Sequence, residues 1–255
     1  MSLAQKAALF SSLHVKSDPI ILYNIWDPGS AGIVQAAGAK ALATGSWPVA
    51  AAHGFADGEN IPLEMMADNI ARIVGSTDLP VSADLEGGYG VEPDAVAASA
   101  SRIVQAGAVG FNFEDQIVGG AGLHETQLQV QRIAAARAAV DQITPGIFIN
   151  ARTDIFLKAK PEDHTNDMLG AAIARAKAYG DAGASGFFAP GLVDEDMIAK
   201  LCADCALPVN IIALPHAPAT SRLAALGVAR VSYGPVPYRM MAAWLEEQAR
   251  AAFNY

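Results

Sequence analysis

Four segments of the chain repeat one pattern, in which a glycine separates an alanine-rich stretch from a short apolar run. The segments read AAGAKAL, QAGAVGF, DAGASGF and ALGVARV, and their glycines are Gly38, Gly107, Gly183 and Gly227. Glycine is expected there because the residue after a helix commonly adopts a left-handed backbone conformation that other residues enter only with strain. The pattern predicts repeated helix-to-strand units and therefore an α/β fold.

Apolar runs bounded by turn residues predict eight strands. Five runs rich in β-branched residues lie at 19–25, 79–86, 109–115, 146–154 and 207–214, and three weaker ones lie at 39–45, 185–191 and 229–235. Alanine-rich stretches with periodic apolar residues predict helices at 94–105, 125–140, 167–179 and 194–203. Because the runs are continuous rather than alternating, we expect a parallel sheet covered by helices.

Eight strand-and-helix units in 255 residues match a closed (β/α)8 barrel of the TIM type. A doubly wound sheet also fits the alternation, but this number of units in this length favours the barrel. No linker or charge run divides the chain, so we predict a single domain over residues 1–255. The last predicted helix, 237–253, carries Met240, Met241, Trp244 and Leu245 and is expected to dock on a neighbouring subunit.

Charge and composition exclude several classes of protein. The chain has 17 Lys plus Arg against 26 Asp plus Glu, a net charge of −9, which argues against binding to nucleic acid or anionic lipid. Only Cys202 and Cys205 are present, which excludes a disulfide framework, and no apolar run is long enough to span a bilayer. We expect a cytoplasmic protein with neither nucleic acid nor a membrane among its partners.

Charged side chains follow three consecutive predicted strands. Asp84 and Glu86 end the third strand, Glu114 ends the fourth and Arg152 ends the fifth. The carboxyl ends of barrel strands meet at one rim, where chemistry is usually found. Carboxylates gathered there repel one another unless a cation lies among them, and a hard divalent ion with oxygen ligands is the simplest such cation. The glycines of the GGYG segment would let the backbone approach a ligand closely.

Several of these residues also have an ordinary structural interpretation. Arg152 could hold a ligand carboxylate through two parallel hydrogen bonds, or form a salt bridge with Asp154 or Glu114. Asp57 and Glu59 could reach a metal through water, or be solvated loop residues. His216 could face the site or serve as a loop or capping residue. The CxxC pair, Cys202 and Cys205, lies on a predicted helix away from the rim, where packing is the expected role.

At SADLEGGYG, NFEDQ and INARTD the sequence resembles the isocitrate lyase and phosphoenolpyruvate mutase superfamily. The three motifs occur in order on consecutive predicted strands, and the resemblance covers nearly the whole chain. It implies a (β/α)8 barrel whose last helix is often exchanged between subunits, with Mg²⁺ bound at the rim. It also implies a 2-oxo or 2-hydroxy acid substrate and a reaction through an enolate or a related oxyanion.

The resemblance assigns roles to individual residues. Asp84 looks like the direct metal ligand, and three further carboxylates look like groups that reach the ion mainly through water: Asp57, Glu86 and Glu114. Arg152 resembles the arginine that grips the substrate carboxylate, while Gly45 and Ser46 match the segment that contacts the substrate oxygens. Family members often carry Asp where this chain has Glu86. Arg152, Ser46 and Glu114 are our candidate catalytic residues, and His216 is a further candidate for substrate binding.

The segment after the fourth strand departs from the family pattern. Isocitrate and methylisocitrate lyases carry a catalytic cysteine there, whereas this chain reads IVGGAGLHE and has no cysteine before residue 202. Phosphoenolpyruvate mutases place a lysine and an asparagine where Gly120 and Gly122 stand. This segment supplies no acid or base except His124. The sequence therefore argues against cysteine-dependent lyase chemistry and against mutase chemistry.

These observations favour a Mg²⁺-dependent carbon–carbon lyase, with Mn²⁺ as a substitute metal. Oxaloacetate decarboxylation, or another cleavage that releases pyruvate, needs the fewest specialised side chains because the electrons flow into a metal-polarised carbonyl. Two alternatives stay open: phosphonopyruvate mutase or hydrolase chemistry at a P–C bond, and a 2-oxo-acid-binding protein with little turnover. The expected partners are a small 2-oxo or 2-hydroxy carboxylate and further copies of the chain, as a homodimer or homotetramer.

Overall fold

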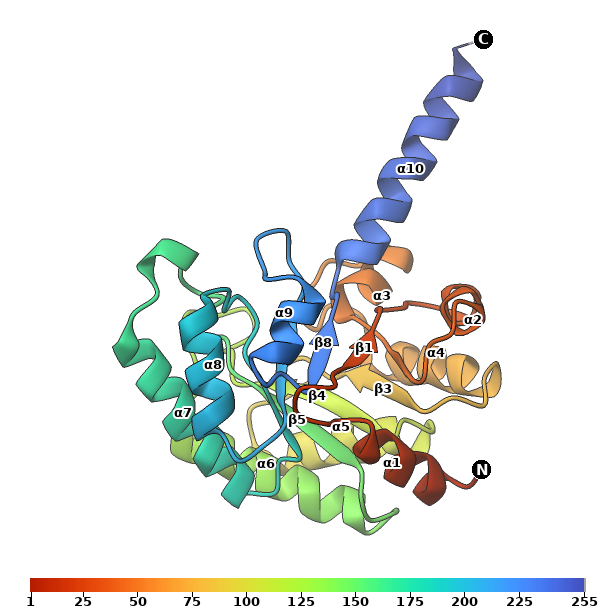
Figure 1. Ribbon diagram of the computed structural model, residues 1–255. Coiled ribbons are helices and arrows are strands. Elements are labelled where there is room, and N and C mark those ends of the chain that lie inside the picture. The colour runs from red at the N-terminus through yellow and green to blue at the C-terminus, as the bar shows by residue number, and fades with distance from the viewer. Residues whose placement is uncertain (255) are drawn as a thin grey trace.

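Eight parallel strands form one sheet that curls around a central axis, as predicted (Figure 1). The computed structural model describes residues 1–254. The strands are β1 (Ile20–Leu22), β2 (Leu42–Ala43), β3 (Val81–Asp84), β4 (Gly110–Glu114), β5 (Phe148–Arg152), β6 (Gly186–Phe188), β7 (Val209–Ile212) and β8 (Arg230–Ser232). Each predicted apolar run contains one of them, the three weaker runs included.

The sheet closes between its first two strands through very few backbone contacts. The strand order is β1, β8, β7, β6, β5, β4, β3, β2, so β1 and β2 lie at its two ends. A single parallel bridge between Ile25 and Thr44 joins them, and the Ile25 amide donates to the Ala43 carbonyl at 2.9 Å. The result is a nearly closed barrel, which confirms the predicted (β/α)8 fold.

Helices surround the barrel (Figure 1). They are α1 (Leu3–Ser12), α2 (Pro28–Ala36), α3 (Ser46–Ala52), α4 (Leu63–Gly75), α5 (Pro93–Gln105), α6 (Thr126–Asp141), the 3₁₀ turn η1 (Pro161–Asp163), α7 (Asn166–Asp181), α8 (Glu195–Asp204), α9 (Thr220–Ala225) and α10 (Val236–Phe253). The glycines that predicted the joints have φ of 98°, 101°, 103° and 96° at Gly38, Gly107, Gly183 and Gly227. Each follows the end of a helix, as the repeated pattern predicts.

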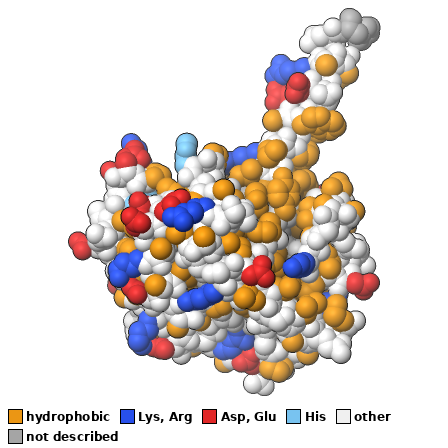
Figure 2. Space-filling model, in the orientation of Figure 1, with side chains coloured by type: hydrophobic (Ala, Val, Ile, Leu, Met, Phe, Trp, Pro, Cys, Tyr) orange, Lys and Arg blue, Asp and Glu red, His pale blue; other side chains and the backbone are white. Residues whose placement is uncertain are grey.

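Helix α10 leaves the barrel instead of packing on it. Figure 1 shows it projecting from the body, and Figure 2 shows apolar side chains along it. Met240, Trp244 and Leu245 are 61%, 62% and 56% exposed. An apolar groove of about 520 Å³ lies on the body between the end of α1, β1 and α2. Within residues 1–254, no helix is long and apolar enough to cross a membrane.

Candidate active site

A cavity of about 330 Å³ opens at the carboxyl ends of the strands. Five of the residues singled out from the sequence line it: Gly45, Ser46, Asp57, Asp84 and Arg152. Its remaining polar lining comes from Asn24, Asn112, Ser232 and Arg239, and its apolar walls include Trp47, Leu157, Phe188, Pro190, Ile212 and Leu214. The rim that the strand ends predicted is therefore a real concave site with a polar floor and apolar sides.

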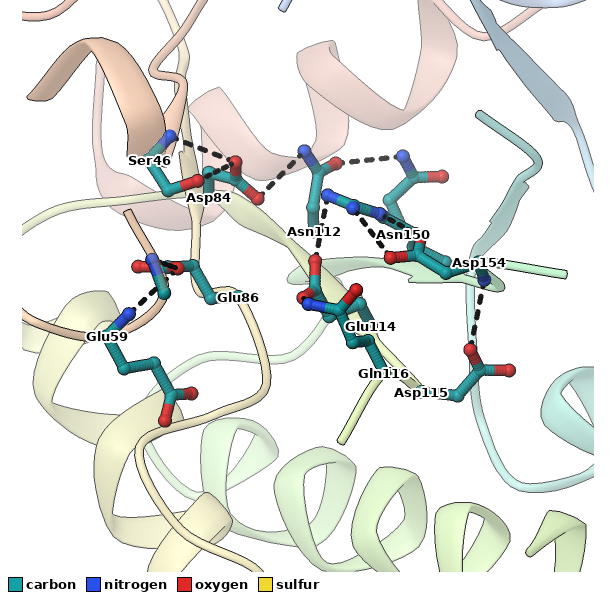
Figure 3. A network of polar contacts seen from close by, with 12 residues as sticks. Ser46, Glu59, Asp84, Glu86, Asn112, Glu114, Asp115, Gln116, Asn150 and Asp154 are labelled. Atoms are coloured by element: carbon teal, nitrogen blue, oxygen red, sulfur yellow. Dashed lines mark hydrogen bonds and ion pairs between the residues drawn. The ribbon is translucent and has the colours of Figure 1, made fainter. Parts of the chain in front are cut away.

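Asp84, at the end of β3, is the carboxylate in the middle of this site (Figure 3). Its Oδ2 accepts hydrogen bonds from the Ser46 amide at 3.0 Å and from the Ser46 hydroxyl at 2.9 Å. Its Oδ1 faces the Asn112 amide nitrogen at 3.4 Å. Asp84 is only 8% exposed, so these contacts fix its position while it still lines the cavity.

Glu86 lies beside Asp84 on the loop that follows β3 (Figure 3). Its backbone is left-handed, with φ of 52°, and its Oε2 accepts from the amides of Gly58 and Glu59 at 3.0 Å each. Burial and the Asp84 carboxylate raise the pKa of Glu86 to about 8. Asp57 lines the cavity, where partial burial of its carboxyl, followed by the Asp84 carboxylate, raises its pKa as well.

Arg132 holds the loop that carries Glu86, a role that the sequence did not reveal. Its side chain is 1% exposed, and its guanidinium donates to the carbonyl oxygens of Gly87 and Gly90. The same guanidinium lies 4.9 Å from the centre of the Phe113 ring. This buried arginine on α6 therefore fixes the GGYG segment against the body of the barrel.

Arg152 sits between two carboxylates on the other side of the site. Its Nη1 lies 2.8 Å from Glu114 Oε2, and its Nε and Nη2 donate to the two oxygens of Asp154 at 2.6 and 2.9 Å. Burial lowers the pKa of Arg152, but Glu114 and Asp154 outweigh this effect and raise it above its ordinary value. Both salt bridges considered from the sequence are thus formed together. A guanidinium has five N–H groups, so two remain for a ligand.

Glu114 is buried at 4% exposure. Burial raises the pKa of its carboxyl, while Arg152 acts in the opposite direction. It does not line the cavity; it reaches the site through Arg152 and through Gln116, whose amide lies 3.4 Å from its Oε1. Of the predicted catalytic residues, Arg152 and Ser46 face the cavity directly and Glu114 stands behind them.

The acidic side of the site fits a hard divalent cation. Within residues 1–254, Asp57, Asp84 and Glu86 form no salt bridge, because Arg152 is engaged by Glu114 and Asp154. Burial, followed by the nearby Asp84 carboxylate, raises the pKa of Glu86. In the same part of the chain, no three acidic, histidine or cysteine side chains approach closely enough to hold a metal directly. The geometry therefore suits one direct carboxylate ligand with others acting through water.

The backbone amides of Gly45 and Ser46 both donate hydrogen bonds within the protein. The Gly45 amide donates to the Ile25 carbonyl at 3.3 Å, and the Ser46 amide donates to Asp84. Ser46 begins helix α3, a short helix that the sequence reasoning did not identify. Trp47 next to it stacks under Arg239 of α10, whose guanidinium lies 4.8 Å from the Trp47 ring centre. Trp47 and Arg239 were missed because they lie on loop and helix starts that carry no periodic signal.

Two histidines considered from the sequence lie outside the cavity lining. His216 is exposed on the loop between β7 and α9, so the structure does not bring it to the other site residues. His124 is buried beside the start of α6, and its backbone contacts Asp115 and Arg175. Burial, then Arg132 and Arg175, lower the pKa of the His124 ring.

The glycine-rich segment after β4 folds into a small hairpin next to the site. Gln116 and Leu123 form an antiparallel bridge, and the Ile117 amide donates to the Gly122 carbonyl at 3.2 Å. Gly122 has φ of 83°. Within residues 1–254, no side chain of 115–125 lines the cavity.

Both cysteines lie at the opposite end of the barrel from the cavity. They are buried free thiols at the end of α8, where Lys16 donates to their carbonyl oxygens at 2.7 and 3.3 Å. Burial raises the pKa of the Cys202 thiol to about 11 and also raises that of Cys205. Their packing role matches the expectation from the sequence.

The phosphoenolpyruvate phosphomutase family model matches residues 10–253, nearly the whole chain. The chain belongs to the phosphoenolpyruvate mutase and isocitrate lyase family. This match confirms the resemblance found in the strand-end motifs.

Solved and curated relatives agree with the family assignment. A crystal structure of a suspected phosphonomutase from Burkholderia cenocepacia J2315 has a TM-score of 0.96 and 45% identity, covering 98% of this chain and 100% of that one. An uncharacterized protein of Mycobacterium tuberculosis is 36% identical over 231 residues, covering 90% of this chain and 83% of its own. An oxaloacetate decarboxylase of Chromohalobacter salexigens is 29% identical over 239 residues, covering 90% and 79%. 2-Methylisocitrate lyases are also among the relatives.

Proposed function

We propose that the protein is a Mg²⁺-dependent carbon–carbon lyase acting on a small 2-oxo or 2-hydroxy carboxylate, with oxaloacetate as the leading substrate. The observation that carries this proposal is that Asp84 and Arg152 line one cavity of about 330 Å³. A carboxylate suited to a cation and a guanidinium with unused N–H groups lie on opposite sides of the same space. That pairing suits a ligand that has both a metal-chelating oxygen pair and a carboxylate.

Each residue has a defined task in this proposal. Asp84 would hold the cation, with Asp57, Glu86 and Glu114 reaching it through water, and Mn²⁺ would substitute for Mg²⁺. The cation, when bound, polarises the 2-oxo carbonyl and stabilises negative charge on its oxygen. Arg152 would bind the substrate carboxylate through its remaining N–H groups. Asn112 and Ser46 would orient Asp84, and the apolar walls would contact the carbon chain of the substrate.

In the decarboxylation of oxaloacetate the bond between C3 and C4 breaks. Its electron pair moves into the C2 carbonyl, CO₂ leaves, and the enolate of pyruvate takes a proton at C3 from water. Arg152 keeps the C1 carboxylate in place throughout, so the breaking bond stays aligned with the carbonyl π system. The reaction needs no cysteine, which agrees with buried thiols far from the cavity.

The similarity to an oxaloacetate decarboxylase supports this reaction, and the glycine hairpin argues against the cysteine-dependent reaction. Pyruvate release from oxaloacetate should be measured with protein and Mg²⁺, with Mg²⁺ alone and with the Asp84→Asn variant. The Mg²⁺-only control is essential because the free ion can polarise the same carbonyl. Phosphate release from phosphonopyruvate would instead assign P–C chemistry. Oxalate binding without turnover of either substrate would assign a binding protein.

We propose that helix α10 packs on a second copy of the chain. The helix that follows the last strand of a barrel normally covers that strand, but α10 exposes Met240, Trp244 and Leu245 to solvent. The groove between α1, β1 and α2 is lined by apolar side chains such as Ile21 and Val34, and Ile21 is 38% exposed. Mutual exchange would bury both surfaces in a homodimer, and pairs of dimers would give a homotetramer.

A further inference from the structure

A layer of polar side chains lies inside the barrel beneath the cavity. The interior of such barrels is usually filled by branched aliphatic residues. Here inward positions of β4, β5, β7 and β8 carry Asn112, Asn150, Asn210, Ser232 and Arg230 instead. These five side chains are at most 6% exposed. Burying polar groups this deeply is costly unless they are hydrogen-bonded, and burying a charge is costly unless it is also paired.

Arg230 is the charged member of this layer and has no acidic contact. It is 1% exposed, its Nη2 donates to Asn112 Oδ1 at 3.0 Å and its Nε donates to Ser232 Oγ at 3.3 Å. Within residues 1–254 it forms no salt bridge, and its Nη1 has no hydrogen-bond partner. Both of its contacts, Asn112 and Ser232, line the cavity above.

The neighbours of Arg230 leave its charge directed toward the cavity. His14 lies on the side of Arg230 away from the cavity. Burial, followed by the charge of Arg230, lowers the pKa of the His14 ring to about 3, so this ring stays neutral. Burial lowers the pKa of Arg230 to about 9, and Asp84 opposes this effect. Arg230 therefore remains a cation near neutral pH, and the acidic group that feels its charge is the Asp84 carboxylate.

Asn112 connects Arg230 and Asp84 through a single amide; Figure 3 shows its contacts with Asp84 and Asn150. A guanidinium can only donate and a carboxylate can only accept. The amide oxygen must therefore face Arg230, and the amide nitrogen must face Asp84, where it lies 3.4 Å from Oδ1. Asn150 supports the same orientation by donating to Asn112 Oδ1 at 2.9 Å. One N–H of the Asn112 amide is left for a ligand in the cavity.

We propose that Arg230 is a positioning residue for an anionic ligand of the cavity: through Asn112 it directs an amide N–H toward that ligand and Asp84, and its fixed positive charge lies beneath both. The inference rests on the proposed 2-oxo-acid site but not on which bond is cleaved. It requires an anion in the cavity. A cation held by Asp84 would be weakly disfavoured by Arg230, whereas a bound carboxylate or enolate would be favoured.

The test uses the full-length protein and compares Arg230→Met, Arg230→Lys and Asn112→Ala with the wild type. Arg137→Met is the matched control, because Arg137 is a partly buried arginine that contacts Asp141 and the Ile147 and Gly183 carbonyls, away from the cavity. Thermal unfolding reports the fold. Mn²⁺ affinity is measured alone, and oxalate affinity is measured at saturating Mn²⁺.

We expect Arg230→Met to bind oxalate about tenfold more weakly, because a buried positive charge beneath the cavity is lost, while its Mn²⁺ affinity is unchanged or higher. Arg230→Lys keeps the charge and should stay within about threefold of the wild type. Asn112→Ala should also weaken oxalate binding, and the double variant Arg230→Met with Asn112→Ala should lose less than the product of the two single effects.

Weaker oxalate binding together with unchanged or higher Mn²⁺ affinity would not arise if Arg230 had a merely structural role. Parallel loss of Mn²⁺ and oxalate affinity, or oxalate binding equal to that of Arg137→Met, overturns the inference. If Arg230→Met does not fold, two other variants provide the test: Asn112→Ala, and Arg230→Lys combined with Asn112→Ala. Unchanged oxalate binding in either variant overturns the inference equally. A wild type that binds Mn²⁺ but no oxalate overturns the proposed function together with this inference, whereas oxalate binding that ignores Arg230 overturns this inference alone.

Discussion

Arg152 Nη1 lies 2.8 Å from Glu114 Oε2, and the two residues are direct register partners on β5 and β4. Their salt bridge is therefore built into the sheet and does not depend on a flexible loop. Asp154 holds the other edge of the same guanidinium. A guanidinium fixed by two carboxylates presents its remaining N–H groups in one orientation, which is the arrangement that selective binding of a carboxylate needs.

Replacing Arg152 by lysine should weaken substrate capture more than it affects the fold. An ammonium group cannot contact Glu114, Asp154 and a ligand carboxylate in one plane, so we expect a loss of about 1.5 to 3 kcal/mol in binding. The measurement is the Kd for oxalate at saturating Mg²⁺, with the Michaelis constant as a second readout. Unchanged values would assign Arg152 to its two salt bridges alone.

Replacing Asp84 by asparagine should remove metal binding without unfolding the protein. Asparagine keeps the size of the side chain, while loss of the direct carboxylate ligand should lower Mn²⁺ affinity by at least about 100-fold. Removal of one anion also relieves repulsion on Glu86, so the metal-free Tm should not fall. Mn²⁺ titration and thermal unfolding test both parts. An unfolded variant would make Asp84 a structural residue.

The metal-free protein should lose stability as pH rises toward 8. The pKa of Glu86 is raised from 4.5 to about 8 in the folded protein, so between these values the folded state holds a proton that the unfolded chain has released. The stabilisation from this group is full below pH 4.5, declines between pH 4.5 and about 8, and is lost above that pH. We expect Glu86→Gln to flatten this part of the Tm profile, and added Mg²⁺ to reduce the wild-type loss. A parallel decline in both proteins would contradict the assignment.

The hairpin after β4 should contribute movement rather than proton transfer. Gly122 has φ of 83°, so Gly122→Ala strains its left-handed backbone by about 1 kcal/mol and should slow turnover. Gly170→Ala is the control, because this glycine lies within α7 and an added Cβ meets nothing within 4 Å. His124→Ala should have little effect. A large loss confined to His124→Ala would assign proton transfer to this hairpin.

Charge placed on α10 should dissociate the oligomer. Trp244 is 62% exposed in a single chain, and Trp244→Asp would bury a carboxylate if the helix packs on a second copy. We expect light scattering to show a smaller particle for this variant. Glu246→Gln, two residues further along and therefore on the opposite side of the helix, changes an exposed charge and should keep the wild-type mass. A wild type that is monomeric would refute the exchange.

Strand ends made much of the site predictable. Apolar runs located the strands, and the polar residues that follow them, Asp84, Glu86, Glu114 and Arg152, all lie near one rim in the structure. This works because a parallel barrel brings every carboxyl end to the same side. The helix joints were equally predictable, since a positive φ at each joint strongly favours glycine.

The residues of the site that were not predicted from the sequence are of two kinds. Trp47 and Arg239 lie in the first turns of α3 and α10, where no periodic pattern indicates which side chains face the cavity. Asn112 and Arg230 lie inside strands, and their signal was present as polar residues two positions apart, Asn112 with Glu114 and Arg230 with Ser232. A period of two places both members on the same face of a strand. His216 was a candidate only because it follows β7, and the loop there carries it into solvent.

A single bridge, between Ile25 and Thr44, joins β1 to β2, so this boundary has the fewest paired residues in the barrel. It lies directly beside Gly45 and Ser46. Amide hydrogens at the boundary between β1 and β2 should exchange with solvent faster than those between β4 and β5, where five residue pairs are in register. A ligand that contacts both Ser46 and Arg152 would connect the boundary between β1 and β2 to β5, which has five register pairs with β4. Occupancy of the cavity should therefore slow hydrogen exchange at the amides of Ile25 and Gly45, which donate across this boundary, far more than at the interior of β4.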